Sequence, residues 1–299
     1  MNELKKEKKS GLAGGFLPSL CIIAAGTLWG TMGLFVRRYN AGGLESMSIV
    51  AIRAVITTIL MLIFLLFYDR HLLKIKPKDL WCFLGTGLLS ILFFNFCYFK
   101  AITLTSLSVA AILLYTAPSI VAVFSCFLFK EKITFKKIIS LLLTFMGCVL
   151  VTGILGGNER LTPMGILIGL GAGLGYALYS IFSKYAILKG YHTYTIIFYT
   201  FLITAIGIIP FGDWKAILNA VNSDHGLIPF SFLFGLASTV LPYILYTLGL
   251  KKTENGRAAI LASVEPVVAT LLGVLVYGET LGWQAVIGVV LVIGALFLS

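Results

Sequence analysis

Residues 110–134 have the sequence AAILLYTAPSIVAVFSCFLFKEKIT, and residues 258–281 have the sequence AAILASVEPVVATLLGVLVYGETL. The two stretches align without a gap at a shift of 148 residues. Extended to 98–131 and 246–279, the alignment holds eight identities in 34 positions. The identical pairs are Tyr98/Tyr246, Thr105/Thr253, Ala110/Ala258, Ala111/Ala259, Ile112/Ile260, Leu113/Leu261, Pro118/Pro266 and Glu131/Glu279. Shared apolar composition gives fewer matches, so the chain consists of two related halves.

The rest of the chain is as apolar as these stretches. Hydrophobic residues make up 59% of the 299 residues. Charged residues make up 12%, which is half of the roughly 25% in soluble globular domains. Soluble domains of this length could not bury so much apolar surface and keep a polar exterior. The composition excludes a soluble enzyme, a nucleic-acid-binding protein and a disordered chain, and it predicts an all-α polytopic membrane protein.

Ten apolar runs are long enough to cross a bilayer, since a spanning helix needs about 20 residues. Continuous apolar runs are typical of helices, because the strands of a membrane barrel alternate polar and apolar residues. The predicted spans are 17–37, 47–67, 80–100, 104–129, 136–154, 163–187, 194–211, 227–249, 257–277 and 281–298. We therefore expect a basic tail at 1–16, a first five-helix repeat at 17–154 and a second at 163–298.

The basic residues between the spans predict their orientation. With the N-terminal tail in the cytoplasm, 17 of the 23 Lys and Arg residues fall in cytoplasmic segments. The outer loops hold Arg37, Arg38, Lys100, Arg160 and Lys215, and Arg53 is left inside a span. Cytoplasmic loops of membrane proteins are enriched in Lys and Arg. We expect a multi-pass protein of the plasma membrane with both termini cytoplasmic, and the net charge of +11 needs no nucleic-acid partner.

Because each half has five spans, the second half crosses the membrane in the opposite sense. A shift of 147 aligns Gly26, Trp29, Phe35 and Arg37 with Gly173, Tyr176, Phe182 and Lys184. Inverted repeats are common among secondary transporters, which bind their substrate near the bilayer midplane where the repeats meet. The sequence thus predicts ten transmembrane helices as two inverted five-helix repeats.

These stretches also resemble a known family. Residues 110–134 and 258–281 resemble the fourth and ninth helices of the EamA-type transporters of the drug/metabolite transporter (DMT) superfamily, and residues 26–38, GTLWGTMGLFVRR, resemble their first helix. The resemblance covers nearly the whole chain. It implies a ten-helix carrier, commonly an exporter of amino acids or related metabolites, with a central cavity lined by both halves.

Pro118 and Pro266 lie near the middle of repeat-related spans. A proline there removes one backbone hydrogen bond and frees the carbonyl four residues earlier, of Leu114 or Ala262. Broken helices at corresponding positions of two repeats point to a transport site, although proline also bends membrane helices for packing alone. We expect the two prolines to act as hinges.

One acid and one base lie deep in the spans. Glu265 is the only deep acidic residue and Arg53 the only deep basic one. A charge at mid-bilayer costs at least ~2.5 kcal/mol on insertion scales, so each should face a cavity or a partner. The rise of an α-helix places them at depths that differ by about 9 Å. Two interpretations stay open: a structural pair, or contacts with opposite ends of a zwitterionic substrate.

Aromatic and polar residues cluster at similar depth or toward the cavity mouths. Aromatic faces bind cations, whereas interfacial belts and packing explain other aromatic residues of membrane proteins. The cluster comprises Trp29, Asn95, Tyr98, Tyr115, Tyr176, Tyr179, Tyr243 and Tyr246. The predicted substrate-binding set is Glu265, Arg53, Trp29, Asn95, Tyr98, Tyr115, Tyr176 and Tyr246.

Two further patterns repeat between the halves. Gly165, Gly169 and Gly173 follow one face of a helix, as do Gly26 and Gly30 in the first span. Such small-residue faces predict close helix packing. Glu131 and Glu279 end equivalent helices, and we expect each to interact with the N-terminal dipole of the helix that follows it.

The sequence contains no catalytic set, metal-ligand spacing or nucleotide-binding loop, so we expect a transporter rather than an enzyme, with no cofactor and no metal. The predicted function is secondary-active export of small polar metabolites such as amino acids or amines by alternating access. A coupling proton or other ion, and a monomer or a homodimer, stay open. The alternatives are a lipid flippase or scramblase, or a membrane-embedded enzyme.

Overall fold

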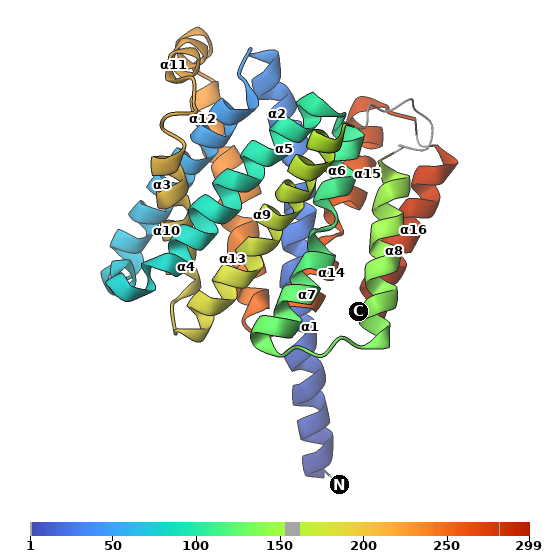
Figure 1. The fold of residues 1–299 in the computed structure, drawn as a ribbon. Coiled ribbons are helices and arrows are strands. Elements are labelled where there is room, and N and C mark those ends of the chain that lie inside the picture. The colour runs from blue at the N-terminus through green and yellow to red at the C-terminus, as the bar shows by residue number, and fades with distance from the viewer. Residues whose placement is uncertain (1, 153–161, 281) are drawn as a thin grey trace.

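The computed structural model describes residues 2–152, 162–280 and 282–299, and for residues 2–15 it describes the backbone alone. The predicted outer-loop residue Arg160 lies outside this part of the chain. The described residues form helices and no strand. The N-terminus extends from the lower end of the helical bundle in Figure 1, and the C-terminus lies toward the same end.

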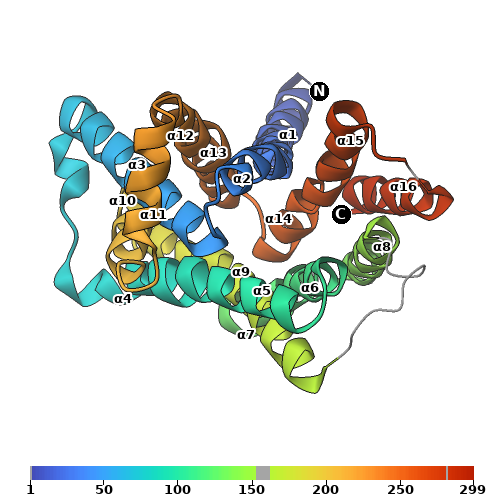
Figure 2. The ribbon, with the colours of Figure 1, turned by 90° about the horizontal axis from the view of Figure 1, so that it is seen from above.

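Within the described residues, seven helical segments are long and apolar enough to cross a membrane: Phe16–Ala41, Ser46–Tyr68, Pro77–Leu104, Leu107–Phe129, Pro163–Leu188, Leu227–Leu250 and Asn255–Tyr277. The other three predicted spans correspond to shorter helices, α8 (Phe135–Val151), α10 (Thr193–Gly207) and α16 (Trp283–Leu298). The chain is therefore a multi-pass membrane protein, whereas the count of ten spans stays a prediction. Figures 1 and 2 show α8 and α16 packed side by side at one edge of the bundle.

The fourth and ninth predicted spans are each divided into two helices. Residues 104–129 correspond to α6 (Leu107–Leu114) and α7 (Ala117–Phe129), and residues 257–277 to α14 (Asn255–Ala262) and α15 (Glu265–Tyr277). Each second helix carries Pro118 or Pro266 in its first turn, where a missing N–H costs no helical hydrogen bond. All four helices begin and end 148 residues from their counterparts, which is the shift of the sequence repeat.

The third and eighth predicted spans each contain a π-helical segment. The first comprises α4 (Leu80–Leu84), the π segment η3 (Gly85–Leu92) and α5 (Phe93–Leu104). The second comprises α12 (Leu227–Gly235), the π segment η5 (Leu236–Val240) and α13 (Leu241–Leu250). The two π segments end 148 residues apart. Apolar periodicity does not predict them, and such segments are frequent at functional sites.

The first helix of each half packs closely against the broken helix of the other half. α1 (Asn2–Gly30) continues into α2 (Met32–Ala41), and its counterpart is α9 (Pro163–Leu188). A methyl group at Gly26 would lie 2.6 Å from the Ala262 carbonyl oxygen, and one at Gly173 would lie 2.8 Å from that of Leu113. Both are shorter than van der Waals contact, so these glycines permit the close packing that the sequence predicts.

Gly26→Ala should therefore destabilise the protein. The added methyl group must push α1 away from Ala262, and overpacking of this kind costs about 1–3 kcal/mol. Thermal unfolding in detergent measures the loss. Gly33→Ala is the matched control, because nothing lies within 4 Å of a methyl group at Gly33. An equal change in both variants would contradict this account.

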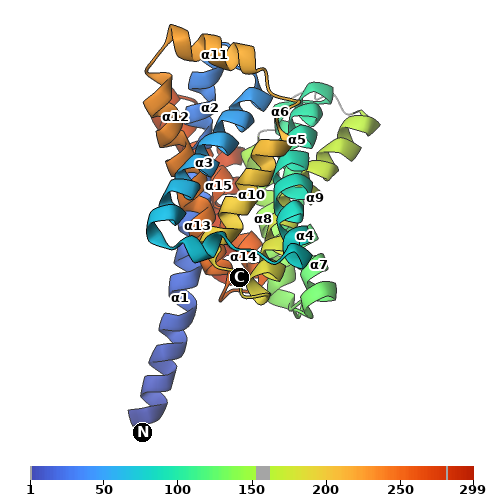
Figure 3. The same ribbon diagram turned by 90° about the vertical axis from the view of Figure 1, so that its left-hand side faces the viewer.

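A short amphipathic helix, α11 (Trp214–Ser223), lies between the seventh and eighth predicted spans. Its N-terminus is capped by Asp213, whose side chain accepts a hydrogen bond from Ala216 N at 2.9 Å. Ala216, Ile217 and Ala220 pack against a cluster that contains Phe234. Figure 3 shows α11 across the end of the bundle opposite the N-terminus. The segment is too short to span a bilayer, and its apolar face packs on α3 (Ser46–Tyr68) and α12.

Candidate functional site

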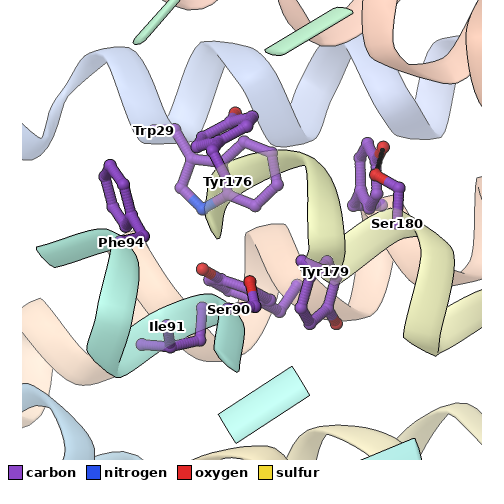
Figure 4. A pocket seen from close by; sticks show the side chains of 9 residues that line it. Trp29, Ser90, Ile91, Phe94, Tyr176, Tyr179 and Ser180 are labelled. Carbon is purple, nitrogen blue, oxygen red and sulfur yellow. Dashed lines mark hydrogen bonds between the residues drawn. The ribbon is translucent and has the colours of Figure 1, made fainter. Parts of the chain in front are cut away.

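An aromatic cavity lies in the centre of the bundle, where helices of the two halves meet. Its open space is small, about 20 Å³ for the centre of a water molecule. Its walls come from α1, η3, α5, α9 and α13, and Figure 4 shows the labelled side chains around the space. The lining residues are Trp29, Ser90, Ile91, Phe94, Tyr176, Tyr179, Ser180, Tyr243 and Tyr246. Two of them, Ser90 and Ile91, lie on the π segment η3.

Trp29 is the centre of the aromatic contacts. Its ring centroid lies 5.1 Å from that of Tyr243, 5.4 Å from that of Tyr246 and 6.4 Å from that of Tyr176. The side chain is 8% exposed. Trp29 and Tyr176 are counterparts in the two repeats. The contact between these two counterparts places the cavity where helices of the two halves meet.

Hydroxyl contacts fix the tyrosine rings. The hydroxyl groups of Tyr246 and Ser180 are 2.7 Å apart, and those of Tyr179 and Thr247 are 2.9 Å apart. Tyr176 differs from both, because its hydroxyl donates to Oε2 of Glu265 at 3.2 Å. This hydrogen bond connects the aromatic cavity to the deep acidic residue.

Glu265 is the first residue of α15, directly after the break in the ninth predicted span. The carboxylate is favourably placed there, because the N-terminus of a helix carries a partial positive charge. A methyl group at Gly30 would lie 2.8 Å from the Glu265 carbonyl oxygen, so α1 packs directly against this turn. The break thus presents a half-buried carboxylate to the centre of the protein.

Arg53 lines a second small cavity, together with Met32, Asn95 and Phe234 among others. The side chain is 5% exposed, and Nη1 lies 3.5 Å from the Met32 sulfur. Asn95 donates to the Ile91 carbonyl oxygen at 2.7 Å. Arg53 and Glu265, both of which the structure describes, attract each other electrostatically but form no ion pair within 4 Å. The two charges therefore occupy separate positions beside the aromatic cavity.

The structure distributes the predicted site residues over several places. Trp29, Tyr176 and Tyr246 line the aromatic cavity, and Arg53 and Asn95 line the second one. The remaining two tyrosines line neither cavity. Tyr98 packs on Phe94, with ring centroids 5.8 Å apart, and Tyr115 packs against the cluster around Cys148.

Sequence reasoning missed four lining residues: Ser90, Ile91, Phe94 and Ser180. Ser180 follows Tyr176 by four positions and therefore shares its face of α9, a signal that the sequence contained. Ser90 and Ile91 face the cavity from a π segment, where the ordinary helical periodicity does not hold. Among the described residues no group of three or more His, Cys, Asp and Glu could hold a metal ion.

Comparison with known proteins identifies the family of this chain. The sequence profile described as the EamA-like transporter family matches residues 17–153 and again residues 163–299. An uncharacterized transporter of Archaeoglobus fulgidus is 30% identical over 93% of this chain and 94% of its own length. The uncharacterized transporter YetK of Bacillus subtilis is 26% identical over 83% and 76% of the two chains.

A more distant relative is the threonine/homoserine exporter RhtA of Escherichia coli, which is 26% identical over 62% of this chain and 60% of its own. One solved crystal structure matches 94% of this chain and 95% of its own with a TM-score of 0.75 at 19% identity, which shows a shared fold. The two profile matches cover almost the whole chain, and its similar proteins are named as transporters. The chain belongs to the EamA-like transporter family of the DMT superfamily.

Proposed function

We propose that this transporter exports amino acids or related amines from the cytoplasm, by alternating access of two inverted five-helix halves. The observation that carries the proposal is that a buried base and a half-buried acid are held apart: Arg53 lines the second cavity, and Glu265 accepts a hydrogen bond from Tyr176 in the wall of the aromatic cavity. Intramembrane charges without a direct partner are costly and mark substrate or ion pathways.

Arg53, Glu265 and the aromatic cavity around Trp29 together match the chemistry of a zwitterion. A guanidinium group binds a carboxylate through two parallel hydrogen bonds, which suits Arg53 to the substrate carboxylate. A carboxylate and aromatic faces both attract ammonium groups, which suits Glu265 and Trp29 to the substrate amine. The name of the relative RhtA, a threonine/homoserine exporter, supports the same class and direction.

The test is a flux assay in proteoliposomes that contain the purified protein. Vesicles are loaded with a mixture of labelled amino acids, amines and organic acids, and efflux is followed with and without a proton gradient. We expect selective efflux of one or a few amino acids or amines. Flux of labelled phospholipid without flux of any small solute would instead support a lipid flippase or scramblase.

We expect ten spans with both termini in the cytoplasm. In a variant without native cysteines, a cysteine at Asn222 on α11 should react with an impermeant thiol reagent added outside. Cysteines at His71 and Lys251 should react only after the membrane is permeabilised. Asn158, a further predicted outer position, lies outside the described residues. External labelling of His71 or Lys251 would contradict this topology.

We expect the helix breaks to act as hinges. Proline inside a helix costs about 3 kcal/mol, so Pro118→Ala with Pro266→Ala should favour continuous helices over broken ones. Turnover should then fall by about tenfold or more, with expression and thermal unfolding largely unchanged. Pro77→Ala, in an exposed turn outside the helix breaks, is the control. Unchanged turnover in the double variant would make the prolines packing features only.

A further inference from the structure

The fourth and ninth predicted spans end in the same backbone geometry. α7 is followed by Lys130 at φ 56° and α15 by Gly278 at φ 65°. The next residue in each case, Glu131 or Glu279, donates its backbone N–H to the carbonyl six residues earlier at 3.2 Å. In both cases a residue in the left-handed conformation ends the helix and turns the chain back over the helix end. Glu131 and Glu279 therefore occupy equivalent positions directly after two equivalent helix ends.

The two carboxylates have different partners. Glu131 accepts hydrogen bonds from the backbone N–H groups of Asn255 at 2.7 Å and Gly256 at 3.2 Å. Both N–H groups belong to the first turn of α14, which packs against α7. Glu131 Oε2 also lies 3.8 Å from Nζ of Lys137 in the first turn of α8. The helix N-terminus whose N–H groups Glu131 caps is nevertheless that of α14, in the other half of the protein, and not that of α8 as the sequence predicts.

Glu279 forms no such cap. It pairs with Arg37, whose Nη2 lies 2.6 Å from Oε1, and the Arg37 guanidinium lies 3.9 Å from the Tyr277 ring centroid. The repeat counterparts of Asn255 and Gly256 are Leu107 and Ser108, at the start of α6. Within the described part of the chain, their backbone N–H groups have no recorded acceptor.

The repeat-related basic residues Arg37 and Lys184 also have different partners. Lys184, the repeat counterpart of Arg37, donates to the carbonyl oxygens of Leu250 at 3.0 Å and Thr253 at 3.2 Å. These residues form the turn between α13 and α14. At one end of the molecule, Glu131 and Lys184 therefore both bind backbone groups at or just before the start of the ninth predicted span. At the other end, Glu279 and Arg37 hold each other.

We propose that Glu131 and Glu279 are alternating latches that close opposite ends of the transport pathway. In this structure Glu131 holds α14 to α7 and closes the end at which the N-terminus lies. In the opposite conformation Glu279 leaves Arg37 and accepts from Leu107 and Ser108, which holds α6 to α15, while Glu131 releases α14. This inference rests on the proposed alternating access, but not on the identity of the substrate.

Two introduced pairs of cysteines can report which end of the transport pathway is closed. An ideal Cβ atom at Gly256 lies 3.5 Å from Cβ of Ala122, which is within the range for a disulfide. Their repeat counterparts are Ser108 and Thr270. In a variant without native cysteines, we expect the 122–256 pair to cross-link with the Glu131 latch closed. The 108–270 pair should cross-link only in the opposite conformation.

Glu131→Gln should lower the ratio of 122–256 to 108–270 cross-linking by about tenfold, because two hydrogen bonds to a charged acceptor are weakened. Glu279→Gln should raise the ratio by a similar factor. Glu45→Gln is the matched control, since Glu45 is an exposed residue directly before α3, away from both latch contacts, and it should leave the ratio unchanged. The cross-linking needs no substrate.

The outcomes separate the latches from the proposed function. If 108–270 cross-links in the parent variant and neither glutamine substitution changes the ratio, the latches are overturned while alternating access stands. If 108–270 cross-links in no variant, both are overturned. Opposite shifts for Glu131→Gln and Glu279→Gln support the latches even where no amino acid is transported.

Discussion

Glu265→Gln and Arg53→Gln should each abolish most transport without loss of folding. In the structure neither charge is neutralised by an ion pair within 4 Å. Each therefore bears a desolvation cost that a neutral side chain of similar shape avoids. Hydrogen bonds to charged groups contribute about 1.5–3 kcal/mol each, so loss of one substrate contact should lower kcat/KM by about 10- to 100-fold. Flux in proteoliposomes and thermal unfolding in detergent measure the two effects.

Loss of stability in both single variants would instead identify Arg53 and Glu265 as a structural pair. Removal of one partner from a buried pair costs about 3–5 kcal/mol, so both single variants would unfold at lower temperature, and the exchange Arg53→Glu with Glu265→Arg would restore folding and some transport. If the two residues bind opposite ends of an oriented substrate, the exchange leaves transport low, because each charge now repels the group that it must bind. Arg38→Gln is the control, since Arg38 pairs with Asp224 at a half-exposed surface position.

Trp29→Ala should impair both affinity and stability. Trp29 contacts three tyrosine rings around the cavity, and truncation of a buried tryptophan costs about 3–5 kcal/mol. The lost aromatic face should raise KM for a cationic substrate by about tenfold, given that a desolvated cation–π contact contributes up to roughly 2 kcal/mol. KM and thermal unfolding are measured on the same preparation.

Two further variants separate affinity from stability. Trp29→Phe keeps an aromatic face and should recover most of the affinity but only part of the stability. Trp283→Ala, which removes a 70% exposed tryptophan at the start of α16, should change neither quantity. An unchanged KM in Trp29→Ala would remove Trp29 from the binding site.

Much of the architecture follows from local sequence. The repeat at a shift of 148 predicts where the broken helices correspond, and the bounds of α6, α7, α14 and α15 follow this shift residue for residue. Apolar length predicts the long spans, and proline predicts where two of them are interrupted. These features depend on neighbours along the chain, so a single sequence contains them.

The candidate site was predictable where it coincides with the repeat. Trp29 and Tyr176 are repeat counterparts, and they meet at the centre of the protein. Ser90 and Ile91 were not predictable, because a π segment changes which side chains face inward. The helix α11 was missed for a different reason: its amphipathic pattern is present in the sequence, but a segment of ten residues is too short to be predicted as a span.

The sequence by itself determined two equivalent glutamates at the ends of two equivalent helices. It could not determine that Glu131 binds the start of α14 while Glu279 binds Arg37. Those partners lie 124 and 242 residues away along the chain, so neighbouring residues do not show which partner each glutamate meets. Two halves with the same local pattern predict the same contacts, and only the packing of the two halves against each other decides which glutamate caps a helix of the other half.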